Sequence, residues 1–531
     1  MPFLVKKNIS GLLAAAVQKL VKNNIFSPQV SDKTVPVEYP LPEFGDYASP
    51  LPMQLASVLR QAPLKIAETI NNNLDKNGII CQAECVKPGY INMRLNPDAF
   101  TTAIIDLASE DFFRGPYTNK PESILLEFVS ANPTGPLHIG HGRWAAIGDI
   151  LGNILSFAGH KVQKEFYIND AGVQIKKLRE SAAAVKNGQP VPEDGYHGDY
   201  IKRIVQNPLP PEQVILEEQK NTLQRFRTVF DNFFPETKLH TEKKIEEMIT
   251  FLEQKGYSYK KEGALWFCSM QYGDDKDRVL IKENGEYTYF AVDIAYHYNK
   301  ISRGFSHLIN VFGADHHGYV KRIQTACRLL SEEKTRLTVL VGQLVNLFRN
   351  GEPVRMSKRT GDMITLEEVI DEIGVDAARY FLSCMACETP LDFDLAAAIK
   401  QSADNPVYYI QYAHARICSV YNKAAEKNCY PASQGSFNYR LIRTPESDAL
   451  VKYLMRFPDE ISEISVSFEI HRLHKYLYSL AGMFHRFYFN HKIINPEEPE
   501  KSAALLFLSK AVEQVLKTGL RLLNISAPEK M

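Results

Sequence analysis

The chain has 531 residues, of which 45% are hydrophobic and 23% are charged. This length exceeds what one hydrophobic core usually organises, so we expect about two to four domains. The 62 basic residues balance the 62 acidic residues, and this balance excludes recognition of a partner by bulk charge alone. No segment approaches the roughly 20 apolar residues of a membrane span, so we expect a cytoplasmic protein with no membrane partner.

Eight cysteines are scattered along the chain, which argues against a disulfide framework. Cys384 and Cys387 form one CxxC pair, but no second pair at zinc spacing accompanies them. We therefore expect buried free thiols and no structural zinc.

The N-terminal region, residues 1–118, has the pattern of a small α+β domain. Apolar residues between positions 9 and 21 recur every three or four residues, as on a helix packed against a sheet. A second helix is predicted at residues 55–74, and residues 86–95 alternate as in a strand. The Gly- and Pro-containing stretch 115–121 lacks apolar periodicity and predicts a linker.

A Pro- and Gly-rich turn follows, within the string SANPTGPLHIGHGR at residues 130–143. An apolar run at 124–129 predicts a strand before it, and a helical pattern starts at residue 137. Pro133 and Gly135 end the strand and force the turn. After the helix, residues 162–168 predict another strand. This βαβ alternation predicts a Rossmann-like, doubly wound parallel sheet that binds its ligand at the carboxyl ends of the strands.

Three residues of this string, His138, Gly140 and His141, fall in the first turn of the predicted helix. Unpaired backbone N–H groups at a helix N-terminus form an anion site. Gly140 lets a ligand approach the backbone, and the two imidazoles supply hydrogen-bond donors near the positive end of the helix. These groups together suit a nucleotide triphosphate, although histidines that merely cap a helix would give the same local pattern.

The string ANPTGPLHIGHGR resembles the HIGH motif of class I aminoacyl-tRNA synthetases. Its leading Asn-Pro-Thr-Gly-Pro resembles the version in arginyl-tRNA synthetases, as do YINDAGVQIKKL at 167–178 and GYHGDYI at 195–201. The resemblance implies that L-arginine reacts with ATP, accompanied by Mg²⁺, to give arginyl-adenylate. The arginyl group then passes to the 3′-terminal adenosine of tRNA(Arg), and AMP and pyrophosphate are released.

Residues 211–263 have mainly helical patterns, and we interpret about 185–262 as an insertion in the catalytic domain. A polar basic loop follows further on, and its MSKR at 356–359 resembles the second class I signature, Lys-Met-Ser-Lys-Ser. The sequence departs from that signature at both ends, with Arg355 at the position of the first Lys and Arg359 at the position of the last Ser. By this resemblance His138, His141 and Lys358 are catalytic. The residues implied to bind ATP are Pro133, Gly135, His138, Gly140, His141, Met356, Ser357 and Lys358.

Arginine requires a carboxylate for its planar guanidinium group. Tyr289 and Asp293 lie four residues apart at the start of a predicted helix and can share one face. Asp293 is the first candidate, against the alternative of a helix cap or a surface carboxylate. By resemblance, the backbone groups of the substrate would be held by Glu127, Ser130 and Asn132. Either His316 or His317 would add another polar contact, and we include His317 in the predicted site.

After residue 392 the chain is almost wholly helical by pattern. The string NPVYYIQYAHARICSVY, residues 405–421, resembles the opening of the helical anticodon-binding domain of arginyl enzymes. The aromatic run from position 476 to 489 could stack on bases, but such a run more often belongs to a core.

We therefore predict three domains and a monomer. They are an N-terminal tRNA-contacting α+β domain (1–118), a class I catalytic nucleotide-binding domain (119–395) and an all-α anticodon-binding domain (396–531). Three alternatives stay open: another class I synthetase such as a cysteinyl enzyme, an HxGH-type nucleotidylyltransferase, and a catalytically inactive RNA-binding paralogue.

Overall fold

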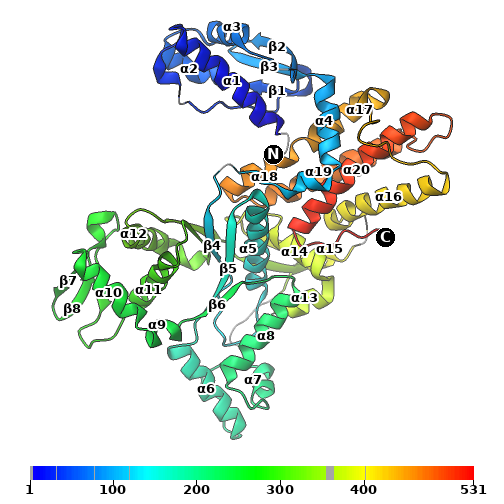
Figure 1. Cartoon of the computed structure of the whole chain (residues 1–531). Coiled ribbons are helices and arrows are strands. Elements are labelled where there is room, and N and C mark those ends of the chain that lie inside the picture. Colours follow the sequence, from blue (N-terminus) through cyan, green and yellow to red (C-terminus); the bar gives the residue numbers. More distant parts are fainter. Residues whose placement is uncertain are drawn as a thin grey trace.

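Figure 1 shows a central layered body with smaller units around it. The structure, a computed structural model, describes all residues except 1–3, 32, 77, 119, 355–363, 401 and 403, together with the side chains of 315–317. The predicted site residues Met356, Ser357 and Lys358 therefore lie outside the described residues, as does the side chain of His317.

A five-stranded parallel sheet forms the centre, in the order β11-β10-β4-β5-β6. Its strands are β4 (Ser123–Glu127), β5 (Lys161–Ile168), β6 (Asn232–Pro235), β10 (His307–Gly313) and β11 (Arg336–Gly342). Helix α5 (Ile139–Ala158) joins β4 to β5, and α12 (Val320–Leu330) joins β10 to β11. From β4 the chain continues to β5 on one side of the sheet, and from β10 it continues to β11 on the other side. This reversal of strand order confirms the predicted doubly wound sheet.

Helix α5 packs closely on the sheet because glycines face it. A Cβ atom at Gly148 would lie 2.2 Å from the ring of Phe128, so only glycine fits between the helix and that side chain. Strand β4 itself is apolar and buried along most of its length, as expected for a parallel strand that is covered on both faces.

An antiparallel sheet, β1-β3-β2, forms the N-terminal unit together with α1 and the helices that follow. The elements are α1 (Val5–Lys22), β1 (Tyr47–Ser49), α2 (Leu51–Leu59), α3 (Pro63–Asn73), β2 (Ile80–Val86), β3 (Tyr90–Leu95) and α4 (Pro97–Leu107). The single helix predicted at 55–74 is wrong, because Arg60 ends α2 in the left-handed conformation (φ +51°) and Pro63 begins α3.

Two groups of elements lie between β5 and β10. The first is α6 (Val173–Lys186), α7 (Asp199–Ile204) and α8 (Pro211–Arg225). The second, after β6, is α9 (Thr237–Thr241), α10 (Lys244–Gln254), the antiparallel strands β7 (Ser258–Lys261), β8 (Ala264–Phe267) and β9 (Arg278–Ile281), and α11 (Tyr289–Ser302). Residues 211–263 were predicted to be mainly helical, yet they include the edge strand β6. Its four residues are too few to show a strand periodicity.

The chain then forms a small mixed sheet and a set of helices. The sheet is β12 (Val345–Arg349), β13 (Glu352–Pro353) and β14 (Leu391–Asp394), and its helices are α13 (Leu366–Ile373), α14 (Val375–Ser383) and α15 (Leu395–Ala398). The C-terminal helices are α16 (Pro406–Glu426), α17 (Pro445–Leu454), α18 (Phe457–Ser467), α19 (His471–Asn490) and α20 (Pro499–Leu522). Short 3₁₀ turns are η1 (Pro28–Val30), η2 (Pro42–Phe44), η3 (Glu110–Arg114), η4 (Ser269–Tyr272), η5 (Ala314–Tyr319) and η6 (Tyr439–Ile442).

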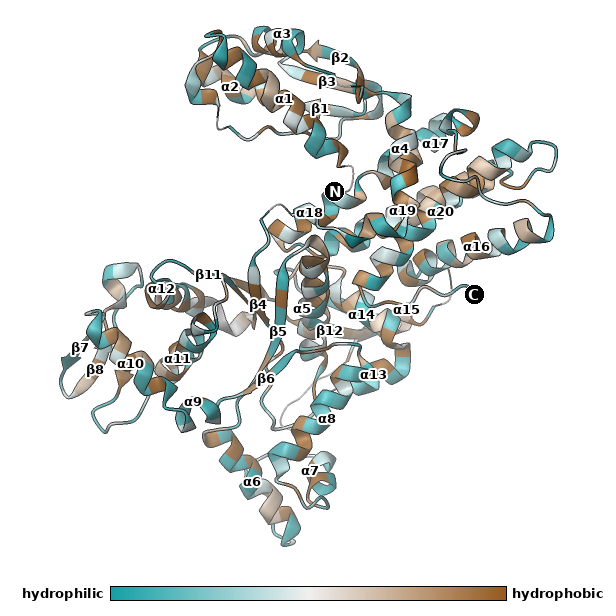
Figure 2. Ribbon diagram, viewed as in Figure 1, coloured by the Kyte–Doolittle hydropathy of each residue, from teal (hydrophilic) through white to brown (hydrophobic). Residues whose placement is uncertain are grey.

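Figure 2 shows hydrophobic residues, in brown, interspersed with hydrophilic ones, in teal, along these C-terminal helices, and many of the apolar residues are buried in the core. In the predicted aromatic run, Tyr476, Phe484 and Phe487 are buried, whereas Phe489 is 89% exposed. Most of the run therefore belongs to the core. No helix in the described part of the chain is long and apolar enough to cross a membrane.

A buried polar cluster fastens the C-terminal end of the helical unit to the central sheet. Arg379 of α14 donates to Asp149 of α5 at 2.7 Å and to the carbonyl of Leu523 at 2.8 Å. Asn524 donates to the same carboxylate at 2.7 Å. Burial alone would raise the pKa of Asp149, but the charges of Arg379 and Lys164 and the hydrogen bonds from Lys164 and Asn524 outweigh burial and lower this pKa.

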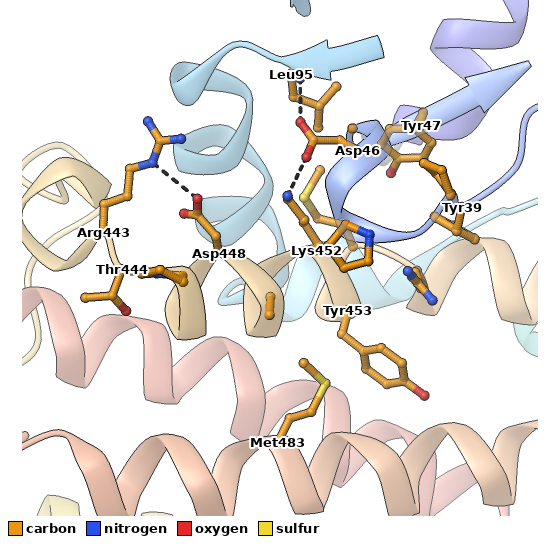
Figure 3. Close-up of a pocket in the computed structure, with 17 residues that line it drawn as sticks. Tyr39, Asp46, Tyr47, Leu95, Arg443, Thr444, Asp448, Lys452, Tyr453 and Met483 are labelled. Atoms are coloured by element: carbon orange, nitrogen blue, oxygen red, sulfur yellow. Dashed lines mark hydrogen bonds and ion pairs between the residues drawn. The ribbon is translucent and has the colours of Figure 1, made fainter. Parts of the chain in front are cut away.

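A second contact joins the N-terminal unit to α17, beside a cavity of about 670 Å³ (Figure 3). Lys452 lies 2.5 Å from Asp46, whose other carboxylate oxygen accepts the backbone N–H of Leu95 at 2.7 Å. The N-terminal sheet is thus held against the helical unit by an ion pair at its edge.

Candidate functional site

A cleft of about 1050 Å³ opens where β4 and β10 end. This is the edge at which a doubly wound sheet binds its ligands, at the reversal of strand order. The end of β4, the tip of α5, the start of α11 and the η5 turn supply its walls. It brings together the predicted site residues Glu127, Ser130, Asn132, His138, Gly140, His141, Tyr289 and Asp293.

The backbone is strained where it leaves β4. Val129 and Ser130 have φ values of +67° and +43°, a region that β-branched residues rarely adopt. The Ser130 hydroxyl donates to Glu127 at 2.9 Å and accepts the backbone N–H of Tyr167 at 3.1 Å. These bonds fix a serine hydroxyl and a carboxylate at the floor of the cleft.

The tip of α5 is closed by its own histidines. Nδ1 of His138 accepts the backbone N–H groups of Gly140 at 3.1 Å and His141 at 3.4 Å. Nδ1 of His141 accepts the N–H of His138 at 3.2 Å, which completes a reciprocal capping box. The two rings stack with their centroids 3.6 Å apart. The prediction that unpaired N–H groups point outward here is wrong for these amides, because imidazole nitrogens accept their hydrogen bonds.

This cap determines the tautomer of both rings. Because each Nδ1 accepts an N–H, a neutral ring must carry its proton on Nε2. Each histidine then acts as a donor through Nε2, and a phosphate oxygen is a suitable acceptor. A Cβ atom at Gly140 would lie 2.9 Å from the ring of His138, so the glycine accommodates that ring.

The turn before the helix is held from another direction. Gln219 of α8 donates to the carbonyls of Asn132 and Gly135 at 3.0 and 2.8 Å, and Tyr200 of α7 donates to the carbonyl of Thr134 at 2.9 Å. Pro133 and Gly135 are not among the described residues that line the cleft. Their contact with ATP stays a prediction.

Tyr289 and Asp293 both face the cleft from the start of α11, as their spacing predicted. The helix is capped by Thr288, whose Oγ1 accepts the N–H of Ala291 at 3.2 Å. Asp293 is therefore not the cap, and its side chain is 29% exposed. Tyr289 is 82% exposed, so its ring lies at the open side of the cleft.

The environment of Asp293 favours its ionised form. Its Oδ1 lies 3.2 Å from Nδ1 of His297, and the Tyr319 hydroxyl hydrogen-bonds to the carboxylate. Burial raises the pKa of Asp293, but the contacts with His297 and Tyr319 and the charge of Lys300 outweigh it and lower this pKa below its usual value. A carboxylate is thus available to a cation that enters the cleft.

Glu236, just after β6, is a second carboxylate in the same cleft. It accepts the hydroxyl of Tyr167 at 2.6 Å. Burial raises the pKa of Glu236 above its usual value, and the negative charge of Asp293 adds to this effect. The negative charges of these two carboxylates repel each other, and a bound cation such as a guanidinium would stabilise both.

A continuous chain of polar contacts joins the two ends of the cleft. Lys300 of α11 is fully buried, donates to Glu127 and lies 3.2 Å from Oδ1 of Asn310. The amide of Asn310 lies 3.0 Å from Nε2 of His297, which contacts Asp293. The relative positions of Glu127 and Asp293 are therefore set by buried groups rather than by solvent-exposed loops.

Sequence reasoning missed four of these residues: Tyr167, Glu236, His297 and Lys300. The spacing on α11 could have indicated two of them, since His297 and Lys300 follow Asp293 by four and seven positions and so share its face. Glu236 gave no such signal, because it follows the short edge strand that was not predicted.

Arg143, the last residue of the first signature, is fully buried. It donates to four backbone carbonyls, those of Gln343, Leu344, Ala386 and Thr389, at 2.7 to 3.3 Å. This arginine therefore joins α5 to the segment between β11 and β12 and to the segment between α14 and β14. These contacts keep the histidine-bearing tip of α5 in place.

Three family models match the chain. The arginyl tRNA synthetase N terminal domain matches residues 7–95, and the catalytic domain of class I (R) tRNA synthetases matches 105–189 and 212–389. The DALR anticodon binding domain matches 410–531.

Individual relatives agree with these matches. The arginine–tRNA ligase of Bacillus subtilis (strain 168) is 43% identical over 515 residues, which is 92% of each chain. Arginine–tRNA ligase 1 of Halalkalibacterium halodurans is 41% identical and covers 94% of this chain and 96% of its own. The solved arginyl-tRNA synthetase of Thermus thermophilus has a TM-score of 0.80 over 99% of this chain and 100% of its own. At 22% identity it supports the fold alone.

Proposed function

The chain belongs to the arginyl-tRNA synthetases and is an arginine–tRNA ligase that uses ATP, and from this premise we propose which of its residues perform each part of the reaction. A carboxylate oxygen of arginine attacks the α-phosphorus of ATP, and the bond to the bridging oxygen of pyrophosphate breaks. A ribose hydroxyl of the terminal adenosine of the tRNA then attacks the carbonyl carbon, gives up its proton and displaces AMP.

At the phosphate end, we assign His138 and His141 to the triphosphate through their Nε2–H groups. Lys358 neutralises charge that develops on the leaving pyrophosphate, with Met356 and Ser357 beside it. Pro133, Gly135 and Gly140 complete the proposed ATP site. The capping box at the tip of α5 supports this assignment, because it leaves Nε2 of each ring as the donor.

At the arginine end, we assign Asp293 and Glu236 to the guanidinium group, with the Tyr289 ring closing the open side. Glu127, Ser130 and Asn132 hold the amine and carboxylate of the substrate, and His317 adds a polar contact. The buried chain of contacts from Glu127 to Asp293 supports this assignment, since it holds the two ends of one amino acid site at a fixed separation.

We propose that tRNA(Arg) is bound by the N-terminal domain (1–118) and the helical anticodon-binding domain (396–531), which flank the catalytic domain (119–395) with its insertion at about 185–262.

Mg²⁺ enters with ATP and is held chiefly by phosphate oxygens. The chemistry needs no zinc. We further propose that the chain acts as a monomer in the cytoplasm.

The observation that carries this proposal is the shared cleft, in which paired imidazoles and paired carboxylates face one space. Charging of tRNA with each of the twenty amino acids tests it, together with ATP–pyrophosphate exchange with and without tRNA. We expect charging with arginine, and discrimination of at least about a thousandfold against lysine, because lysine cannot make the bidentate contact. Comparable charging with lysine would contradict the paired-carboxylate site.

A further inference from the structure

Each carboxylate of the proposed guanidinium site accepts a hydrogen bond from a tyrosine of its own. Oε2 of Glu236 accepts the hydroxyl of Tyr167 at 2.6 Å, and the carboxylate of Asp293 accepts the hydroxyl of Tyr319. All four residues line the same cleft. Tyr167 belongs to β5 and Tyr319 to the end of η5, so two separate parts of the fold supply the same kind of pair.

The ring of each tyrosine is held by its neighbours. The ring of Tyr167 packs against that of Tyr296, with the centroids 4.5 Å apart. The ring of Tyr319 meets the edge of Phe290 at 6.2 Å, and the guanidinium of Arg322 lies 5.1 Å from its centroid. Because these contacts restrict rotation of both rings, each hydroxyl is preorganised at its carboxylate.

Both hydroxyls keep their protons and act as donors. Burial and the negative charge of Glu236 raise the pKa of Tyr167, and burial and the charge of Asp293 raise that of Tyr319. An ionised carboxylate has about four acceptor positions. The tyrosine takes one of them, and His297 takes another on Asp293. Acceptor positions therefore remain on both carboxylates for a ligand.

We propose that Tyr167 and Tyr319 are positioning residues that make the site selective for arginine. Each hydroxyl fixes the rotation of its carboxylate, so that the remaining acceptors of Glu236 and Asp293 meet one planar guanidinium. A guanidinium requires acceptors in a defined plane, whereas an ammonium group is a compact point charge that tolerates rotation of its partner. These roles rest on the proposed function, since they presuppose that the two carboxylates bind the guanidinium.

Tyr167→Phe and Tyr319→Phe each remove one hydroxyl and keep the ring. In ATP–pyrophosphate exchange with tRNA present, each should raise the KM for arginine about tenfold, because a hydrogen bond to a charged group is lost. The kcat and the KM for ATP should stay within about twofold of wild type. L-Lysine, added as a competitive inhibitor, should keep its inhibition constant within about threefold.

Tyr296→Phe is the matched control. The hydroxyl of Tyr296 donates to Glu165 at 2.7 Å, beside the ring of Tyr167, but Tyr296 is not among the described residues that line the cleft. Its arginine KM should match that of wild type, and thermal unfolding shows whether each variant folds. A control that raises this KM as much as Tyr167→Phe would overturn the proposal, as would a wild-type arginine KM in both Tyr167→Phe and Tyr319→Phe.

A pH profile separates positioning from a merely structural role. Burial raises the pKa of Glu236, and the hydrogen bond from Tyr167 lowers it. The contact with His240 also lowers this pKa, while the charges of Asp170 and Asp293 raise it. Without the hydroxyl, Glu236 should gain its proton at a higher pH and lose its charge sooner as the pH falls.

The arginine KM of Tyr167→Phe should therefore rise between pH 8 and pH 6 by at least about threefold more than that of wild type. Exchange at pH 6, 7 and 8 measures this difference. A KM that is raised by the same factor at all three values would show that the hydroxyl does not act through Glu236, and would refute its positioning role.

Removal of the charges distinguishes this proposal from the function on which it rests. Asp293→Asn and Glu236→Gln should each raise the arginine KM about a hundredfold. If these two variants raise it and the tyrosine variants do not, the positioning roles fail and the guanidinium site stands. If none of the four variants changes the arginine KM, the guanidinium site itself lies elsewhere.

Discussion

The backbone N–H of Leu366 donates to the carbonyl of Leu137 at 2.8 Å. An antiparallel bridge between Thr365 and His138 continues this contact. The segment that follows the second signature is therefore bonded to the helix tip that carries the first. Lys358 precedes Thr365 by seven residues, a length of chain that spans at most about 25 Å.

This backbone contact between the two signature segments leads to a prediction for Lys358. Lys358→Ala should lower tRNA-dependent ATP–pyrophosphate exchange by about a hundred- to a thousandfold, because one donor to the transition-state charge is lost. The KM for arginine should change little. Lys334→Ala, an exposed lysine before the amino end of β11, is the control. Exchange within threefold of wild type would remove Lys358 from the mechanism.

A second prediction separates the two roles of His141. His141→Asn can still accept the N–H of His138 and so keep the cap, but it lacks the Nε2 donor. It should fold with an unchanged thermal midpoint and lose about a hundredfold in adenylate formation. His141→Gln, whose amide can reach the Nε2 position, should recover part of this loss. If both variants lose stability and rate together, the ring serves the cap alone.

The third prediction concerns the choice of amino acid. Asp293→Asn keeps the shape of the side chain but removes its charge, so the KM for arginine should rise about a hundredfold, equivalent to roughly 2–4 kcal/mol. The KM for ATP should stay near that of wild type. Asp275→Asn, at a side chain that is 72% exposed, is the control. An arginine KM within a factor of five would move the guanidinium site elsewhere.

The buried pair of Lys300 and Glu127 gives a prediction about stability. Lys300 is fully buried and the Glu127 side chain is 7% exposed, so Lys300→Met leaves an uncompensated charge. We expect a loss of about 3–5 kcal/mol in the unfolding of the catalytic domain. The double variant Glu127→Gln/Lys300→Met should recover most of this loss. Denaturant unfolding of both variants measures the difference, and a double variant less stable than the single one would contradict the argument.

A pH prediction follows from His474 on α19, which lies 2.9 Å from the hydroxyl of Ser383. Burial lowers the pKa of His474 to about 3. In the unfolded chain a histidine titrates near 6.5, so between about pH 6.5 and 3 the unfolded state binds more protons and stability falls as the pH falls.

The non-titrating variant His474→Gln should escape this loss. Between pH 7 and pH 5 its stability should fall by about 2 kcal/mol less than that of wild type. Thermal unfolding of both proteins at pH 5, 6 and 7 measures the difference. Parallel curves would mean that His474 gains no proton on unfolding.

Much of this architecture could be predicted from local pattern. Alternating apolar runs and helical periodicities predicted the parallel sheet, and turn residues marked where β4 gives way to α5. The spacing of Tyr289 and Asp293 predicted their common face, because a helix repeats every 3.6 residues.

What local pattern could not provide were relationships between side chains. That His138 and His141 cap one another depends on rotamers, which leave no trace in residue spacing. Lys300 and Glu127 are 173 positions apart, and only the fold brings them into contact. The role of Glu236 depends on an edge strand of four residues, which tertiary pairing rather than intrinsic propensity stabilises.

The cluster around Asp149 also bears on how the protein is made. The carboxylate on α5 and the guanidinium of Arg379 are both sealed from water, and two of their partners are Leu523 and Asn524. A ribosome releases those residues long after the nucleotide fold has been translated. Until they emerge, the nascent catalytic unit contains charged groups with incomplete partners, so its final consolidation should wait until Leu523 and Asn524 have been synthesised.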